Sequence, residues 1–266
     1  MHEIADIACN FTSDRFNNDI DEVINRAIKN KVVKFALICS QLSDIDKLLK
    51  IYHQYSKNMF FTIGVHPHHA NEINDDYLKK LKELVTSYNP HAIGETGLDF
   101  FRNLSTYEEQ IFAFEEQIKI SIDANKPLFL HQRDSHKEFI KILKKYSSSI
   151  DKSVVHCFTG TQEQLDVYLE LGCYIGITGW VCDEKRNIEL RKTIKNIPIE
   201  RLMIETDCPY LIPKNLDEKP KNNRNEPNNL NHIVKEISKL MEIDEEILRE
   251  KTFKNTIRFF DTKMPL

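Results

Sequence analysis

Short apolar runs and amphipathic stretches alternate eight times along the chain. Each short run is typical of a buried strand, and each amphipathic stretch is typical of a helix packed on a sheet. The expected strands are Ile4–Asn10, Val32–Cys39, Phe60–Val65, Ala92–Glu95, Pro127–His131, Ser153–Phe158, Tyr174–Gly179 and Arg201–Asp207.

The stretches between the expected strands contain recognisable helix starts. Thr106 and Glu109 form a capping-box pattern, and apolar residues follow at helical spacing. Ser135 and Thr161 open two further helices in the same way, and Gly172 is well placed to end the second of them. Helices are therefore expected between the strands.

Four of the expected strands end on side chains suited to chemistry, namely Glu95, His131, His156 and Asp207. A carboxylate at the end of an apolar strand is costly to bury unless it has a partner. Glycines flank Glu95 at positions 94 and 97, where the backbone either adopts a positive φ or passes close to a bound group. One such acid alone would be no more than a cap or a turn, but four matching strand ends indicate a site.

Strands separated by helices predict βαβ units with parallel pairing. Eight such units in one chain are typical of a (β/α)₈ TIM barrel, here a single domain over residues 1–266. A doubly wound open sheet is the alternative, but it would spread the four strand ends along an edge. The irregular stretch 209–227 is expected to be a long loop over the site. Residues 228–266 are expected to close the fold with helices at Leu230–Met241, Asp244–Thr252 and Phe253–Phe260.

Composition narrows the choice of function. The net charge is −4 and the pI is about 6.2, which excludes a generally basic coat for nucleic acid, so any phosphate recognition must be local. Six cysteines lack CxxC spacing, which fits a reduced, cytosolic protein better than a disulfide framework or a zinc ribbon. The first residues are acidic and strand-like, unlike a signal peptide, and no apolar run has membrane-spanning length.

The four strand-end residues are good ligands for a divalent metal. Asp207 is the natural candidate to orient or deprotonate a metal-bound water. Strand alternation predicts that Cys157 points away from the site when His156 points into it. The same parity places Glu205 inward with Asp207, where it would support the site or approach the metal.

Further candidates lie at the rim. Arg133 would hold a phosphate oxygen, although an ion pair with Asp134 or Glu138 is the alternative. His66 is expected to contact substrate. Trp180, the only tryptophan, would stack on a base or simply pack.

The chain resembles the TatD family of metal-dependent deoxyribonucleases, which are amidohydrolase-like TIM barrels. The segments that carry the resemblance are GVHPHH, IGETGLDF, FLHQRDSH, VVHCFTGT, YIGITGWVCDEKR, LMIETDCPYL and RNEP. The resemblance implies a Mg²⁺-dependent 3′–5′ exonuclease acting on single-stranded DNA or RNA. It also implies a cytoplasmic, monomeric protein with a part in repair of oxidised DNA. By motif, Glu95, His131 and His156 would bind metal and Asp207 would be a ligand or acid–base, with His66, Arg133, Glu205 and Arg224 in or beside the site.

The first strand departs from the pattern of many relatives, which have two metal-binding histidines in a DxHxH motif. The corresponding residues here are Ala8 and Asn10. We therefore expect one resident metal, any second ion being loosely held or brought by substrate. Asn10 is instead expected to contact substrate.

The resulting hypothesis is hydrolysis of the terminal phosphodiester by a water held by the metal and Asp207. Mg²⁺ is favoured, although two histidines also suit Mn²⁺ or Zn²⁺. Two alternatives remain open. One is a metal-dependent hydrolase of small C–N or lactone substrates, which the same barrel would permit. The other is a nucleic-acid-binding protein without catalysis.

Overall fold

The computed structural model describes residues 1–220 and 222–261. Eight parallel strands pair in chain order, and an isolated bridge joins Cys9 of the first strand to Cys208, which lies just after the last strand, so the sheet closes into a barrel. This confirms the expected (β/α)₈ fold. The strands are β1 Ile4–Cys9, β2 Val32–Leu37, β3 Met59–Ile63, β4 Ala92–Asp99, β5 Leu128–Arg133, β6 Ser153–Val155, β7 Tyr174–Ile177 and β8 Leu202–Ile204.

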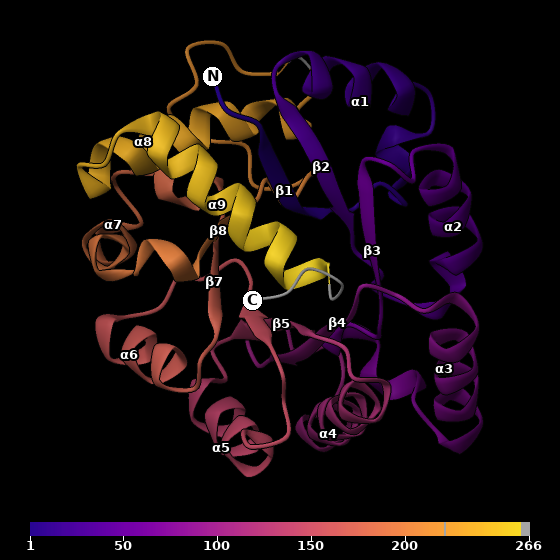
Figure 1. Ribbon diagram of the computed structural model, residues 1–266. Helices are drawn as coiled ribbons and strands as arrows, with labels where there is room; N and C mark the ends of the chain where they lie inside the picture. Colours follow the sequence, from indigo (N-terminus) through magenta and orange to yellow (C-terminus); the bar gives the residue numbers. More distant parts are fainter. Residues whose placement is uncertain (221, 262–266) are drawn as a thin grey trace.

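All of the described helices but the last lie in a ring outside the strands, and the last lies across one end of the barrel (Figure 1). They are α1 Ile20–Lys29, α2 Ile45–Gln54, α3 Asp75–Tyr88, α4 Tyr107–Ala124, α5 His136–Tyr146, α6 Gln162–Glu170, α7 Ile188–Thr193, α8 Leu230–Met241 and α9 Glu245–Phe260. The expected capping box at Thr106 and Glu109 is present at the start of α4. None of the helices in the described part of the chain is long and apolar enough to cross a membrane.

The sequence predicted two helices near the end of the chain, but the structure has one continuous helix there. The interpretation of Asp244–Thr252 and Phe253–Phe260 as separate helices is wrong, because α9 runs unbroken across that junction. The hydroxyl of Thr252 donates to the carbonyl of Leu248 one turn earlier. Its hydrogen bond is therefore made within the helix, and the residue does not end the helix.

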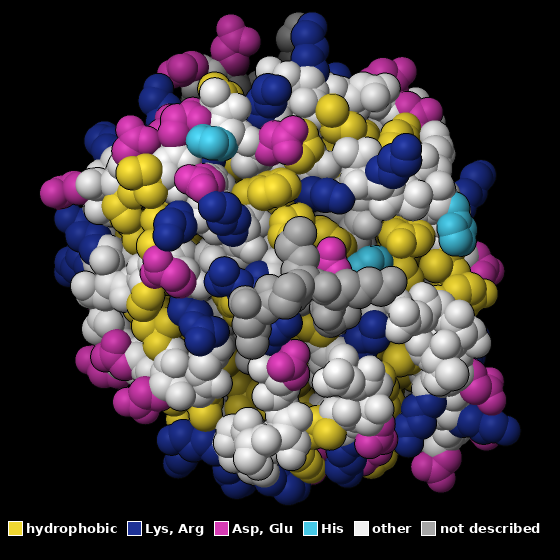
Figure 2. All heavy atoms as spheres, in the orientation of Figure 1, with side chains coloured by type: hydrophobic (Ala, Val, Ile, Leu, Met, Phe, Trp, Pro, Cys, Tyr) yellow, Lys and Arg dark blue, Asp and Glu magenta, His cyan; other side chains and the backbone are white. Residues whose placement is uncertain are grey.

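Helix α9 closes the amino-terminal end of the barrel. Figure 1 looks at this end, where α9 lies across the ring of strands. Its Phe259 and Phe260 pack with Phe60 of β3 and Tyr174 of β7, and the rings of Phe60 and Phe260 are stacked 5.0 Å apart. Acidic and basic side chains are scattered over this face without a gathering of one sign (Figure 2). The plug leaves the carboxyl end of the barrel for the site.

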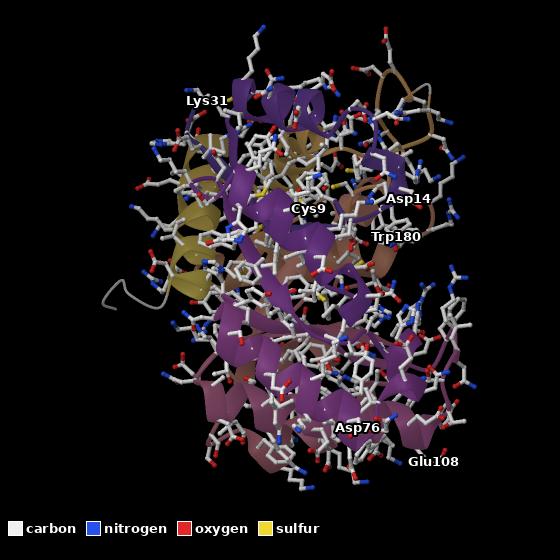
Figure 3. The ribbon with its side chains drawn as sticks, turned by 90° about the vertical axis from the view of Figure 1, so that its right-hand side faces the viewer. Cys9, Asp14, Lys31, Asp76, Glu108 and Trp180 are labelled. Atoms are coloured by element: carbon white, nitrogen blue, oxygen red, sulfur yellow. The ribbon has the colours of Figure 1, made fainter. Side chains whose placement is uncertain are left out.

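The long stretch after β8 contains no helix or strand from Pro209 to Glu226 among its described residues, apart from turns and bends. A short 3-10 turn at Pro227–Asn229 then leads into α8. Asp14 and Trp180 lie in 3-10 turns after β1 and β7, and Glu108 lies in the first turn of α4; Figure 3 shows all three at one end of the barrel. Residues from distant parts of the sequence therefore meet at the carboxyl end of the strands.

Candidate metal centre and active site

The site is built around Glu95 in the middle of β4. The flanking Gly94 and Gly97 have φ values of 146° and 145°, which side chains rarely adopt. A Cβ atom on Gly97 would overlap the carbonyl oxygen of His131 on β5. The glycines therefore allow β4 to approach its neighbouring strand closely, and this brings Glu95 beside the histidine of β5.

Three imidazoles converge on one oxygen of Glu95. Its Oε1 lies 2.8 Å from Nδ1 of His131, 2.7 Å from Nε2 of His156 and 3.3 Å from Nε2 of His66. The nearest nitrogens of His131 and His156 are 3.4 Å apart. All four side chains are largely shielded from solvent.

A carboxylate stands behind each of the two central histidines. Nε2 of His131 lies 3.4 Å from Oδ2 of Asp99, and Nδ1 of His156 lies 3.5 Å from Oε2 of Glu205. Histidines that bind metal commonly turn their second nitrogen towards a carboxylate, which fixes the ring and makes the binding nitrogen more basic. His131 and His156 face carboxylates in this arrangement, although neither nitrogen makes a hydrogen bond to its carboxylate here.

Burial and charge shift the protonation of the cluster. Burial alone would raise the pKa of Glu95, but the imidazoles of His156, His66 and His131 bring it well below its usual value. Although burial disfavours its charged form, Glu95 and Glu205 hold the pKa of His156 well above normal. Burial raises the pKa of Asp207 to about 7, and Glu95 and Glu205 add to that rise. The site is therefore rich in buried carboxylate and attracts positive charge.

The donor atoms fit a divalent cation. Ligands about 2.1 Å from an ion are separated from one another by about 3 Å, and the donors of Glu95, His131 and His156 are 2.7 to 3.4 Å apart. His66 is also within 4.8 Å of the Glu95 and His131 donors. Its Nδ1, however, accepts a hydrogen bond from the backbone of His68 at 3.0 Å. A neutral His66 ring therefore carries its proton on Nε2, which makes that atom a donor and not a ligand.

Comparison with known proteins identifies the family of the chain. The model of a family described as TatD related DNase matches residues 5–261. The chain is 40% identical over 257 residues to the 3′–5′ ssDNA/RNA exonuclease TatD of Edwardsiella piscicida, covering 97% of this chain and 99% of that protein. It is 41% identical over 255 residues to the enzyme of the same name from Yersinia pseudotuberculosis, covering 96% of this chain and 98% of that one.

A crystal structure of a TatD family hydrolase from Entamoeba histolytica superposes with a TM-score of 0.88 at 32% identity, covering 98% of each chain. The chain belongs to the TatD-related DNase family. The sequence resemblance to that family is thereby confirmed over nearly the whole chain.

Cys157 and Asp207 lie just beyond their strands. β6 ends at Val155 and β8 ends at Ile204. The expectation that strand alternation reaches Cys157 and Asp207 is therefore wrong. Both residues have left-handed backbone conformations, with φ values of 48° and 54°. The backbone N–H of Cys157 donates to Oε1 of Glu205 at 2.5 Å, which ties the two strand ends together.

The structure places the other predicted residues in different surroundings. Asn10 does not stand free for substrate, because its amide donates to Oδ1 of Asp207 at 2.9 Å. Arg133 makes no ion pair with Asp134 or Glu138; its guanidinium lies over the ring of Phe101 at 4.1 Å. Arg133 is exposed at the rim and remains a candidate for phosphate contact.

Arg224 requires a correction. Its guanidinium is bound by Asp19 at 2.6 Å and by Glu226 at 2.7 Å, and its side chain is only 6% exposed. Burial against two acids leaves it no free face for a phosphate, so we assign it a structural role in place of the expected substrate contact.

Two residues at the site were missed from the sequence. Asp99 accepts from Nε2 of His68 at 2.8 Å besides facing His131. Burial would raise the pKa of Asp99, but these histidines keep it far below normal. The available signal was parity, because Glu95, Gly97 and Asp99 lie on the same side of a strand that continues past the glycines. His68 lies in the short 3-10 helix Pro67–Glu72 that follows β3.

Proposed function

We propose that this protein is a metal-dependent 3′–5′ exonuclease that hydrolyses phosphodiester bonds at the ends of single-stranded DNA and RNA. The observation that carries the proposal is the convergence of His131 and His156 on one oxygen of Glu95, at 2.8 and 2.7 Å, within a TatD-family barrel. The curated names of relatives about 40% identical supply the substrate class.

In this proposal Glu95, His131, His156 and Asp207 hold one divalent cation. Such a cation lowers the pKa of a bound water and neutralises charge on phosphate oxygens. Mg²⁺ suits phosphodiester chemistry, while the two imidazoles would also accept Mn²⁺ or Zn²⁺. Ala8 and Asn10 supply no imidazole on β1, which supports a single resident ion.

The other side chains act on water and phosphate. Asp207 orients the attacking water and accepts its proton, and Asn10 fixes the rotation of the Asp207 carboxylate. Glu205 acts through His156 and the backbone of Cys157. The Nε2–H of His66 offers a hydrogen bond to a substrate oxygen, and Arg133 swings from Phe101 to a phosphate. Positioning and charge neutralisation then supply most of the rate enhancement.

We further propose that the protein acts as a monomer in the cytoplasm, with a part in repair of oxidised DNA. All six cysteines are free thiols, and five of them are buried, as expected for a reducing compartment.

The deciding experiment uses single-stranded oligonucleotides labelled at the 3′ or the 5′ end. The protein is stripped with chelator, and Mg²⁺, Mn²⁺ or Zn²⁺ is restored separately. We expect stepwise loss of 3′ nucleotides that depends on metal and is abolished in Glu95→Ala. Glu83→Ala, an exposed acid on α3, is the matched control and should retain full activity. Absence of cleavage with every metal would overturn the proposal and favour a hydrolase of small C–N or lactone substrates.

A further inference from the structure

A second feature of the carboxyl end is a cavity of about 310 Å³ beside Asp207. It lies between the loop after β7 and the loop after β8, with one side chain from the loop after β1. The lining residues are Arg15, Gly179, Trp180, Asp183, Arg186, Pro209, Tyr210, Leu211, Ile212, Lys214 and Asn223. The volume is at the lower end of the range of small-ligand pockets.

Close packing of the two loops shapes this cavity. A Cβ atom on Gly179 would come within 2.5 Å of the carbonyl oxygen of Leu211 and within 3.2 Å of Pro213, so only glycine allows this approach. Arg15 adds a third wall by donating to the carbonyls of Pro209 and Asn223, at 3.2 and 2.5 Å. The cavity is therefore a built feature of the fold.

Tyr210, which lines the cavity, lies close in the chain to Asp207. The backbone N–H of Tyr210 donates to the carbonyl of Asp207 at 2.9 Å. Its phenol is close enough to Asp207 and Glu95 that these acids, after burial, raise its pKa. A ligand bound against Tyr210 would therefore lie next to the reacting phosphodiester.

Aromatic rings and cations make up the lining. Tyr210 is 53% exposed, and Trp180 is partly buried. Three cations, Arg15, Arg186 and Lys214, line the cavity together with one acid, Asp183, which pairs with Arg186 at 2.8 Å. Arg15 has no carboxylate partner within residues 1–220 and 222–261. Flat rings beside uncompensated cations suit a ligand with a planar base and a phosphate.

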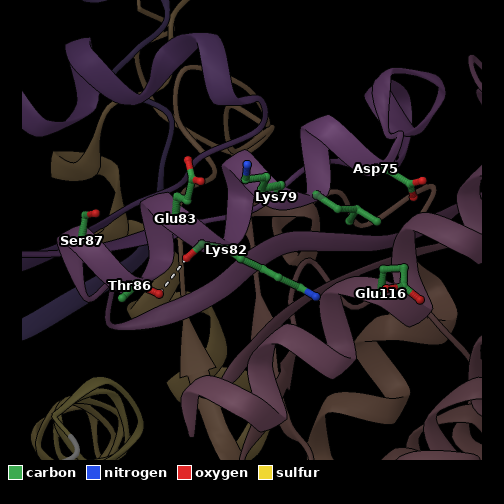
Figure 4. Close-up of a pocket in the computed structure, with 8 residues that line it drawn as sticks. Asp75, Lys79, Lys82, Glu83, Thr86, Ser87 and Glu116 are labelled. Carbon is green, nitrogen blue, oxygen red and sulfur yellow. Dashed lines mark hydrogen bonds between the residues drawn. The ribbon is translucent and has the colours of Figure 1, made fainter.

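A larger cavity elsewhere in the molecule has a lining of a different chemical character. It measures about 640 Å³ between α3 and α4, far from the site, and Figure 4 shows its lining. That lining has no aromatic ring, and its acids Asp75, Glu83 and Glu116 outnumber its two lysines. It lacks both the stacking surface and the positive charge that a nucleotide requires.

We propose that the cavity beside Asp207 is a nucleotide subsite of the enzyme. It receives the nucleotide adjacent to the scissile phosphodiester, with the base against Tyr210 and Trp180 and the flanking phosphate on Arg15 and Lys214. The inference rests on the proposed exonuclease function and adds to it the residues that bind the single-stranded nucleic acid. Because stacking accepts any base, the subsite explains binding without a requirement for sequence.

Trp180 provides a direct measurement because it is the only tryptophan in the chain. The chelator-stripped protein is titrated with a deoxyadenosine tetranucleotide, and with its ribonucleotide counterpart, while tryptophan fluorescence is recorded. Without metal no cleavage should occur, so the signal reports binding alone. We expect saturable quenching by both oligomers, and a dissociation constant raised about tenfold or more in Tyr210→Ala. Tyr210→Phe keeps the ring and should bind like the wild type.

Matched controls separate stacking from charge and from absorbance by the ligand. Tyr88→Ala removes an exposed tyrosine from the end of α3 and should leave the titration unchanged. Tripolyphosphate supplies the charge without a base and should give no comparable quenching. Quenching of equal strength in Tyr210→Ala, or by tripolyphosphate, would overturn the subsite.

Assays of oligonucleotide cleavage distinguish a refuted subsite from a refuted exonuclease function. If the wild type trims oligonucleotides and Tyr210→Ala has the same KM, only the subsite is refuted. If the wild type cleaves no oligonucleotide with any metal, the exonuclease proposal itself is wrong. A raised KM for oligonucleotides in Tyr210→Ala, with bis(4-nitrophenyl) phosphate hydrolysed at the wild-type rate, would support both.

Discussion

The side-chain amide of Asn10 donates to Oδ1 of Asp207 at 2.9 Å, across the seam where β1 meets β8. A second hydrogen bond, from the same nitrogen to the carbonyl of Cys208, measures 3.1 Å. The amide nitrogen is a donor, so it orients the carboxylate but does not bind a metal. Asn10 stands where the DxHxH pattern has a metal-binding histidine. In this protein the residue at that position orients Asp207.

Replacing Asn10 should therefore slow turnover more than it weakens binding. In Asn10→Ala the Asp207 carboxylate loses the donor that fixes its rotation, so we expect kcat to fall about tenfold. The KM for an oligonucleotide and the affinity for metal should change little. Steady-state kinetics with a titration of Mn²⁺ would test this. A raised KM at unchanged kcat would instead show that Asn10 binds substrate directly.

The carboxylates behind the histidines should control metal affinity. In Asp99→Asn the remaining oxygen still accepts from the backbone of Phe101 and Arg102, so the loop is preserved while the negative charge behind His131 is lost. We expect metal to bind about 10- to 100-fold more weakly. Calorimetric titration of the stripped protein measures this without any turnover.

Glu205→Gln is the companion variant because it acts behind His156 in the same way and keeps an acceptor for the backbone of Cys157. Comparable losses in the two variants would support both assignments. An unchanged affinity in Asp99→Asn, with the circular dichroism spectrum retained, would show that the contact with His131 has no role in metal binding.

The alternating pattern was sufficient to predict the barrel, because each apolar run lies in a strand and each strand pairs with the next. It did not give the strand ends, because β4 continues past Glu95 to Asp99, while β6 and β8 end before His156 and Asp207. Alternation could not describe the residues after β6 and β8, because Cys157 and Asp207 turn into left-handed conformations there. Such turns depend on contacts between distant segments, such as Cys157 with Glu205, that local sequence does not specify.

The role of a charged side chain was the least predictable feature. The sequence left open whether Arg133 holds a phosphate or pairs with a neighbouring acid, and only the family resemblance placed Arg224 in or beside the site. Only the folded chain brings Asp19 and Glu226 to Arg224 and leaves Arg133 on an aromatic ring. Asp99 could not be recognised for the same reason, since its partners His68 and His131 come from other elements, a 3-10 helix after β3 and strand β5.

His91 should make the protein sensitive to acid. Its ring packs on Tyr52, Phe60 and Phe61, and its Nδ1 accepts from the backbone of Phe61 at 3.3 Å. Burial lowers the pKa of His91 from 6.5 to about 4. Between these values the unfolded chain binds more protons than the folded one, so stability rises with pH across that window and is lost as pH falls through it.

The effect can be isolated with His91→Leu. From pH 7 to pH 4 the wild type should lose up to about 3 kcal/mol more free energy of unfolding than the variant. Urea unfolding of the metal-free proteins at several pH values measures the difference, and titration of His66 cancels because both proteins contain it. Parallel pH profiles for the two proteins would refute this role for His91.

Arg224 should be needed for stability and not for catalysis. Its guanidinium joins Asp19, before α1, to Glu226, before α8, and lies 4.8 Å over the ring of Phe16. Arg224→Met would leave both acids without this partner, so we expect a loss of about 3 kcal/mol in the free energy of unfolding.

The matched control for Arg224 is Arg26→Met, because Arg26 also binds Glu226, at 2.8 Å, but its side chain is 44% exposed. Exposed pairs contribute about 1 kcal/mol or less, so this variant should unfold at nearly the wild-type urea concentration. Kinetics at a temperature where all three proteins remain folded complete the comparison. A raised KM for oligonucleotides in Arg224→Met at undiminished stability would restore the substrate contact and displace the structural role, because only a guanidinium that leaves its acids could bind a phosphate.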